Sequence, residues 1–105
     1  MFWIEFTTSG YPIWIGKSAK QNDQLTFQIA HKQDLWFHID QTSGPHVILH
    51  CEGKLVTDQD LQETCDITRR YSKSKNKVIY THILNIEKKK YSNVGEVIVS
   101  KPSWG

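Results

Sequence analysis

The sequence contains no apolar run that approaches the roughly 20 residues of a membrane-spanning helix. Its first ten residues, MFWIEFTTSG, lack the basic start and the long apolar stretch of a secretory signal peptide, and they are typical of a β-strand instead. A hydrophobic fraction of 38% excludes the disordered class, and 105 residues allow one modest core. We therefore expect a single cytoplasmic domain over residues 1–105, with no membrane partner.

Cysteine is scarce, and no metal-binding motif stands out. Cys51 and Cys65 are the only two cysteines, and without a signal sequence we expect both to be reduced thiols. No Cys-x-x-Cys pair occurs. His46 and His50 share one face of a predicted strand but lie about 13 Å apart, which is too far to share one ion. The sequence thus predicts neither a metal site nor a cofactor.

Features of a catalytic centre are equally few. Cys51 with His38 or His46 offers a nucleophile and a base, but nothing in the sequence orients such a pair. Neither a glycine-rich phosphate loop nor a nucleophile elbow is present. A cysteine at the end of an apolar strand is more often simply buried. We expect a protein that is not an enzyme.

Acidic residues are nearly missing from one stretch of the chain. Residues 67–90 hold eight lysines and arginines against Glu87 alone, whereas residues 1–66 hold four lysines against nine carboxylates. This asymmetry indicates an anionic partner, and nucleic acid is the leading candidate. A solvated basic face near a helix end explains the same charge pattern equally well.

The order of the predicted elements is ββαββαββ, an α+β fold with a mostly antiparallel sheet of about six strands and two helices. Apolar runs between turn residues predict strands at 2–6, 13–16, 35–39, 46–50, 78–83 and 96–100. Helical spacing predicts helices at 23–31 and within 55–75. Asn22 is expected to cap the first helix, and Thr57 or Asp58 the second. Residues 87–95, EKKKYSNVG, are expected to form a basic turn segment.

The stretch DLWFHIDQTSGPHVILHC, residues 34–51, predicts a β-hairpin around its TSGP turn. We expect Trp36 to lie opposite Ile48. His38 then lies opposite His46 on the same face, and the other face becomes uniformly aliphatic, as a core requires. Whether Trp36 packs under a helix or lies on an exposed face stays open at this point.

Ten residues form the candidate nucleic-acid contact surface. The hairpin offers flat rings for base stacking and a hydrogen-bond donor, and the starts and ends of the helices offer cations for phosphate. The candidates are Lys17, Lys20, Asn22, Trp36, His38, His46, Arg69, Arg70, Lys73 and Lys75.

Several motifs follow one another in a specific order over about residues 10–99. They are IGKSAKQNDQL, DLWFH, SGPHVIL, a helix ending in YSK, VIYT, and a glycine shortly before EVIV. As an ordered set they closely resemble the R domain of the NFACT family, the ribosome-associated quality-control factors. By position the resemblance carries the family pattern onto Gly16, Lys17, Gln21, Asn22, Asp23, Asp34, Trp36, Phe37, His38, His46, Ser72, Lys73, Tyr80, Thr81 and Gly95. The chain departs from that pattern at Ser18, where relatives often have Asn, and at Thr64-Cys65, where they usually have two alanines.

The resemblance implies a predicted RNA-binding module. It implies structured RNA, such as tRNA or rRNA, and ribosomal or quality-control proteins as partners, in the setting of translation. The other domains of the full-length factors do not occur in this sequence, so we expect a stand-alone relative or an excised domain. The main alternative is a protein–protein adaptor that docks through the aromatic hairpin, which would bind its partner almost independently of salt and through Trp36. The oligomeric state is open.

Overall fold

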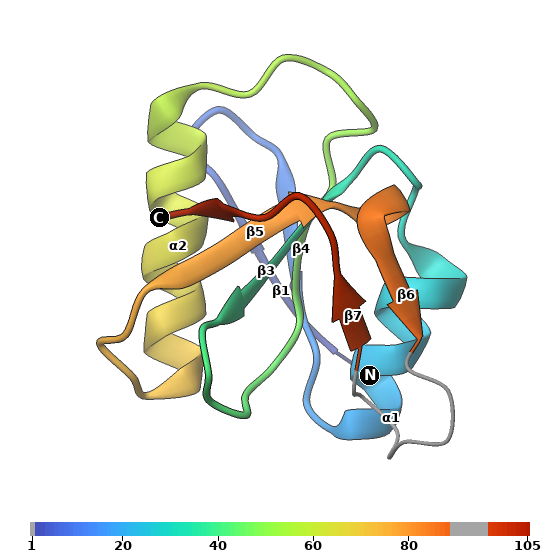
Figure 1. Cartoon of the computed structure of the whole chain (residues 1–105). Helices are drawn as coiled ribbons and strands as arrows, with labels where there is room; N and C mark the ends of the chain where they lie inside the picture. The colour runs from blue at the N-terminus through green and yellow to red at the C-terminus, as the bar shows by residue number, and fades with distance from the viewer. Residues whose placement is uncertain (1, 89–96) are drawn as a thin grey trace.

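The computed structural model describes residues 2–88 and 97–105, which form a central sheet with helices on both of its faces (Figure 1). The main sheet contains β1 (Trp3–Phe6), β2 (Pro12–Ile15), β3 (Leu35–Ile39), β4 (Val47–Leu49), β5 (Val78–His82) and β8 (Ser103–Trp104). A separate pair consists of β6 (Ile86–Lys88) and β7 (Val97–Val99). The helical segments are α1 (Ala19–Gln24), the π-helical turn η1 (Leu25–Ile29) that continues it, α2 (Asp58–Ser72) and the 3-10 turn η2 (Ile83–Asn85).

The main sheet has the strand order β1-β2-β4-β3-β5-β8, and every neighbouring pair is antiparallel. Trp36 pairs with Ile48 across β3 and β4, which confirms the predicted register of the hairpin. The prediction of a mostly antiparallel sheet with two helices is likewise confirmed.

Helix α2 covers one face of the sheet. The aliphatic and aromatic residues that alternate along β3 and β4 point toward it, and Phe37, Val47 and Leu49 are completely buried there. Thr57 caps the helix as predicted: its hydroxyl accepts from the N–H of Asp60, and the Asp60 carboxylate accepts from the N–H of Thr57. The strand alternation and the cap together fix this half of the fold.

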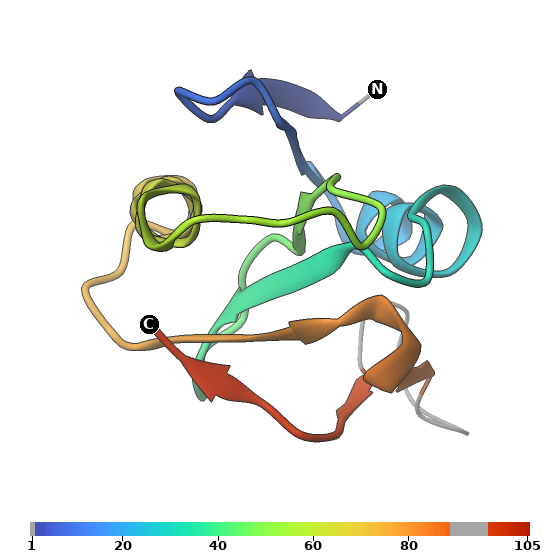
Figure 2. The same ribbon diagram turned by 90° about the horizontal axis from the view of Figure 1, so that it is seen from above.

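Helix α1, the turn η1 and the β6–β7 pair cover the opposite face. Figure 2 shows α1 and α2 on opposite sides of the sheet. A second core forms here around Leu25, Trp36 and Ile48, and Trp36 is only 1% exposed. The face of the hairpin that carries Trp36 is therefore interior, and of the two placements that the sequence left open for this indole the buried one is correct.

The first helix begins earlier than predicted. Ser18 caps it through its hydroxyl, which accepts from the N–H of Gln21 at 3.2 Å, so Asn22 lies inside α1 and is not the cap. Lys20 consequently lies in the first turn of the helix and not in the preceding loop. Within the described residues, β6 and β8 are strands that the sequence did not predict, and β7 starts at Val97.

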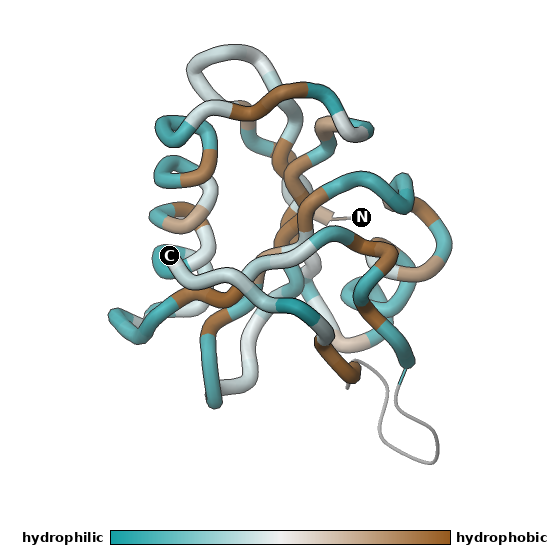
Figure 3. The backbone as a smooth tube through the Cα atoms, turned by 45° about the horizontal axis from the view of Figure 1, so that its top comes forward, coloured by the Kyte–Doolittle hydropathy of each residue, from teal (hydrophilic) through white to brown (hydrophobic). Residues whose placement is uncertain are grey.

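Hydropathy follows this layered arrangement. Figure 3 shows hydrophobic colour along the central strands and hydrophilic colour along the loop that joins α2 to β5. Among the residues that the structure describes, no helix has the length and apolar character needed to span a bilayer.

Candidate nucleic-acid interface

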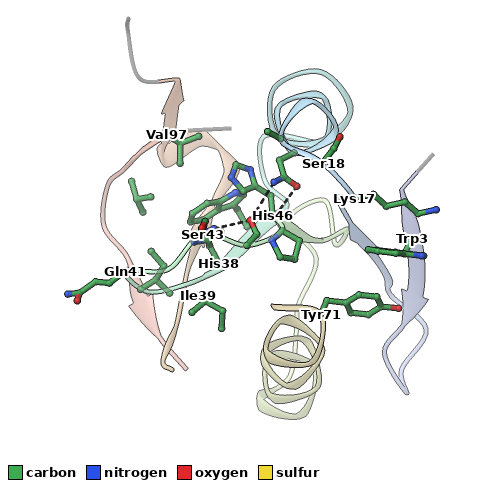
Figure 4. A pocket seen from close by; sticks show the side chains of 18 residues that line it. Trp3, Lys17, Ser18, His38, Ile39, Gln41, Ser43, His46, Tyr71 and Val97 are labelled. Carbon is green, nitrogen blue, oxygen red and sulfur yellow. Dashed lines mark hydrogen bonds between the residues drawn. The ribbon is translucent and has the colours of Figure 1, made fainter. Parts of the chain in front are cut away.

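A groove of about 750 Å³ opens at the end of the sheet where β3 turns into β4 (Figure 4). One side is lined by Trp3, Lys17 and Tyr71, the middle by Asn22, Trp36, His38 and His46, and the other side by Ile79, Val97 and Val99. Five of the ten predicted contact residues therefore line one groove, namely Lys17, Asn22, Trp36, His38 and His46.

The shape of the groove depends on Asn22, which connects α1 to the β3–β4 turn. Its side-chain oxygen accepts from the N–H of His46 at 3.0 Å, and its amide nitrogen lies 3.5 Å from the carbonyl oxygen of Gly44. The Asn22 side chain lies directly against Gly16, where an added Cβ would overlap its Oδ1 atom. Gly16 also donates its N–H to the carbonyl of His46 at 3.1 Å. Gly16 and Asn22 thus place the turn, and Asn22 is a structural residue with 8% exposure.

His46 is also a buried structural residue. It is 2% exposed, and its Nδ1 lies 2.8 Å from the hydroxyl of Thr26. Its ring meets the edges of Trp36 and His38 at centroid distances of 5.2 and 5.5 Å. His46 therefore offers little exposed surface to a ligand, and its contact with nucleic acid stays a prediction.

His38 is half-buried and reaches the groove above Trp36, on which its ring stacks at 5.6 Å. Its Nε2 lies 3.2 Å from the carbonyl of Gly44, so this nitrogen carries the hydrogen and donates it. Burial lowers the pKa of His38 below its ordinary value of 6.5, and the bond to Gly44 offsets this only in part. His38 can therefore offer a neutral imidazole to a ligand near pH 7, but not a positive charge.

Two aromatic residues that the sequence did not single out form the groove's outer wall. The rings of Trp3 and Tyr71 lie 5.1 Å apart, and Lys17 Nζ lies 5.0 Å from the centre of the Trp3 ring. In Figure 4 the indole of Trp3 lies between Lys17 and Tyr71. Trp3 belongs to β1 and Tyr71 to the last turn of α2, so no motif along the chain joins them.

The lysines of the predicted surface remain exposed around this end of the molecule. Lys17 and Lys20 lie at the start of α1, and Lys73 and Lys75 follow the end of α2. Lys73 comes directly after Ser72, whose side chain lies against Gly44 in the β3–β4 turn. The cations of the two helix ends therefore lie on either side of the same turn.

The two predicted arginines have partners inside the protein. Arg69 donates to the carbonyls of Asn76 at 3.0 Å and Gly105 at 2.6 Å. Arg70 forms an ion pair at 2.7 Å with Glu5 of β1. Both guanidinium groups connect α2 to other elements, so the sequence prediction that they contact phosphate is not supported by this geometry.

A second polar cluster lies at the opposite end of β3 and β4. The fully buried Asp34 carboxylate accepts from the N–H groups of His31 and Glu52 and lies 2.7 Å from Nδ1 of His50. His50 in turn stacks on Trp14 at 4.3 Å. This cluster joins the start of β3 to the end of β4, and its arrangement is that of a structural connection.

The cysteines give no support to a nucleophilic site. Both are free thiols, as predicted, and both are buried. Burial raises the pKa of Cys51 and raises that of Cys65 to about 11, so both stay protonated near neutral pH. Within residues 2–88 and 97–105, no three His, Cys, Asp or Glu side chains are placed to hold a metal ion.

Comparison with known proteins shows which family this chain belongs to. The family model described as "NFACT protein RNA binding domain" matches residues 1–101. The chain belongs to this NFACT-R family. It is 33% identical over 86 residues to the Rqc2 homolog RqcH of Bacillus subtilis (strain 168), covering 78% of this chain and 15% of that protein. It is 29% identical over 99 residues to coiled-coil domain-containing protein 25 of Bos taurus, covering 86% of this chain and 47% of the relative.

A solved structure has the same NFACT-R fold. It is the C-terminal part of the fibronectin/fibrinogen-binding protein from Streptococcus suis, with a TM-score of 0.88 and 25% identity. The match covers 96% of this chain and 43% of that one. The chain thus spans less than half the length of each of these three relatives.

Several residues of the NFACT-R pattern hold the domain together. Asp23 of α1 forms an ion pair with Lys88 of β6 at 2.9 Å. Tyr80 stacks on Phe37 at 5.1 Å, and the hydroxyl of Thr81 donates to a carbonyl of the segment before β8. Residues 89–96 lie outside the described residues; they include the pattern residue Gly95, most of the predicted turn segment 87–95 and the first residue of the predicted strand 96–100.

Proposed function

We propose that this chain is a non-catalytic RNA-binding module that acts in ribosome-associated quality control, with residues 1–105 working as one domain. The NFACT-R match and the similarity to RqcH support the setting. Structured RNA, such as tRNA or rRNA, is the proposed ligand class. A cytoplasmic location remains a prediction from the sequence.

One observation carries the proposal: exposed lysines at the start of α1 and just after the end of α2 lie on either side of the β3–β4 turn, beside the groove that Lys17 lines. Lys17 and Lys20 lie on the α1 side, and Lys73 and Lys75 on the α2 side. RNA presents closely spaced phosphates, and lysines that neutralise several of them release counterions and so supply most of the affinity. The lysines that lie beside the β3–β4 turn would act in this way.

The groove adds polar groups that neutral ligand atoms can use. The His38 imidazole reaches it as a neutral ring, and the Ser18 and Ser43 side chains line it. These groups suit hydrogen bonding to base edges or ribose hydroxyls rather than phosphate neutralisation. Lysines around a groove that contains neutral donors and acceptors fit RNA better than they fit an enzyme substrate, because the groove holds no activated nucleophile.

The burial of the hairpin's aromatic rings argues against the alternative function, a protein–protein adaptor that docks through them. Trp36 is 1% exposed, and Phe37 is completely buried. A partner could reach these rings only after α1, α2 or the β6–β7 pair had moved away. The RNA-binding proposal requires no such movement.

The proposal is tested by fluorescence anisotropy with labelled tRNA, an unstructured RNA and a duplex DNA. We expect tRNA to bind most tightly, and the double variant Lys73→Ala/Lys75→Ala to bind all RNAs several-fold more weakly at low salt. The matched control is Lys32→Ala/Lys54→Ala, which removes two exposed lysines near the opposite end of β3 and β4. Absence of tRNA binding at low salt would overturn the proposal. Equal weakening of RNA binding by both double variants would mean that RNA is attracted by the overall charge of the protein and not by this surface.

A further inference from the structure

The indole of Trp3 is a large apolar surface that the fold leaves partly open to solvent. Trp3 is 43% exposed, although it lines the groove and contacts both Tyr71 and Lys17. Trp36, the other tryptophan of the groove, is buried in the core with Leu25 of η1 and Ile86 of β6 and is only 1% exposed. Of the two indoles, only Trp3 is accessible to a ligand that enters from solvent.

The position of Trp3 is fixed by two contacts of strand β1. Antiparallel pairing places Trp3 opposite Ile15, the residue before Gly16 and Lys17. The ion pair of Arg70 with Glu5, two residues further along β1, attaches the strand to α2. This attachment brings the ring centre of Tyr71 to 5.1 Å from that of the Trp3 indole. The aromatic wall is therefore already formed before any ligand binds.

We propose that this wall binds one unpaired nucleotide of the bound RNA, with its base stacked on Trp3 and its phosphate held by Lys17. The inference rests on the RNA-binding function proposed above and specifies which part of an RNA enters the groove. Bases inside a duplex have no free face, so the nucleotide must come from a loop, a bulge or a single-stranded end. An aromatic ring beside a lysine is the arrangement with which single strands are bound, because every base has a face that stacks.

Lys17 has a specific part in this binding mode. Its ammonium group lies 5.0 Å from the centre of the Trp3 ring, where it covers one face of the indole. A cation at an exposed ring gains only a weak attraction, so a stacking base can displace it. The flexible side chain then swings to the phosphate of the same nucleotide. The groove volume of about 750 Å³ falls within the range of pockets that hold small molecules.

The test uses a single-stranded oligoadenylate of about ten nucleotides that contains one 2-aminopurine, and a blunt RNA duplex of about 16 base pairs. We expect 2-aminopurine fluorescence to be quenched on binding, and the single strand to bind more tightly than the duplex. Trp3→Leu should weaken binding of the single strand between about 5-fold and 150-fold, the range for one base–aromatic stack, while Trp3→Phe retains most of it. Both variants are first checked for wild-type circular dichroism and melting.

The matched control is Phe6→Ala on the same strand. Phe6 is 63% exposed but lies on the face of β1 opposite to Trp3, and it does not line the groove. We expect its RNA affinity to be unchanged. Normal quenching and affinity in Trp3→Leu, or tighter binding of the duplex than of the single strand, would overturn the inference while leaving the RNA-binding function intact. Failure of wild-type protein to bind any RNA, tRNA included, would instead overturn both.

Discussion

At the scale of single residues, much of the NFACT-R pattern in this chain consists of buried polar groups that hold irregular backbone. Asn22 accepts from the N–H of His46, and Asp34 accepts from two N–H groups and faces His50. Buried polar groups are stable only when they are paired, so each of these side chains constrains its neighbours closely. The residues that we propose to contact RNA lie around them and are mostly lysines.

The buried carboxylate of Asp34 gives the first prediction. Asp34→Ala leaves the N–H groups of His31 and Glu52 without their acceptor and His50 without its partner, so we expect a loss of about 3 kcal/mol in unfolding free energy. The matched control is Asp66→Ala on the exposed side of α2, whose ion pair with Arg69 is 3.6 Å long. That variant should lose less than about 1 kcal/mol. Urea denaturation measures both, and similar losses in the two would contradict the structural role of Asp34.

His38 gives a prediction about pH. Its pKa is lowered by burial, so the unfolded chain takes up a proton near the ordinary value of 6.5 while the folded one resists it. Stability is therefore full above about pH 6.5 and falls as the pH drops below it. Three carboxyl groups also have a lowered pKa, but they titrate at more acidic pH than His38. They are those of Glu5, Asp60 and Glu63.

The variant that tests this is His38→Gln, whose amide can still donate to Gly44. We expect its melting temperature to change less than that of the wild type between about pH 7.5 and about pH 5.5. The melting temperature of each protein is measured at each pH, and the change on acidification is compared between the two. If both proteins lose the same number of degrees on acidification, His38 does not carry the pH dependence.

At the scale of elements, the end of α2 combines a structural constraint with the proposed binding role. Lys73 is its C-cap and adopts the left-handed conformation, with φ of 52° and ψ of 41°. In this conformation a non-glycine residue lowers the stability of the folded protein by about 1 kcal/mol or more relative to glycine. A lysine at this position is therefore less favourable for stability than a glycine, which fits a role outside folding.

The matched pair of variants is Lys73→Gly and Lys73→Ala. We expect Lys73→Gly to be more stable than the wild type by up to about 1 kcal/mol, and Lys73→Ala to show no such gain. Both should bind tRNA more weakly to the same extent, because both lose the same charge. Denaturant titration and anisotropy on the same samples separate the two effects. Wild-type RNA affinity in both variants would exclude Lys73 from the contact surface.

Elements also show how far the sequence alone could predict the fold. The register of β3 and β4 was predictable because their aliphatic residues had to share a face. The burial of Trp36 was not, since the segments that pack against it, η1 and the β6–β7 pair, come from other parts of the chain. The ion pair of Arg70 was not predictable for the same reason, because its partner Glu5 is 65 positions away. The first helix was placed too late because Ser18 was not recognised as its cap.

The candidate site was predictable in part. Lys17 and His38 line the groove, and Lys73 follows the end of α2 beside the β3–β4 turn. The ordered motifs pointed to all three residues and the charge pattern to Lys73, and their contact with RNA stays a prediction. Trp3 was missed because its significance depends on Tyr71, which lies in α2 and meets β1 only in the folded protein. A single exposed aromatic in a strand carries no signal of its own.

At the scale of the whole molecule, one sheet separates two cores, and the groove opens at one end of that sheet. The Asp34 cluster closes the opposite end with a buried carboxylate. Residues 1–66 carry an excess of acid and residues 67–90 an excess of base, yet folding brings Lys17 and Lys20 to the same end as Lys73 and Lys75. Two of these four lysines come from the acidic part of the sequence, so the fold brings them together with the other two, and the salt dependence of binding measures their combined effect.

The most direct test of this account is the salt dependence of tRNA binding by the wild-type chain and by Lys17→Ala/Lys73→Ala. Four lysines at phosphates predict that log Kobs falls against log[salt] with a slope of about −3, and that the double variant reduces the slope to about half. Trp3→Leu should weaken binding with the slope unchanged, since stacking releases no counterions. A slope near zero with affinity retained, or the same slope in the wild type and the double lysine variant, would contradict the account.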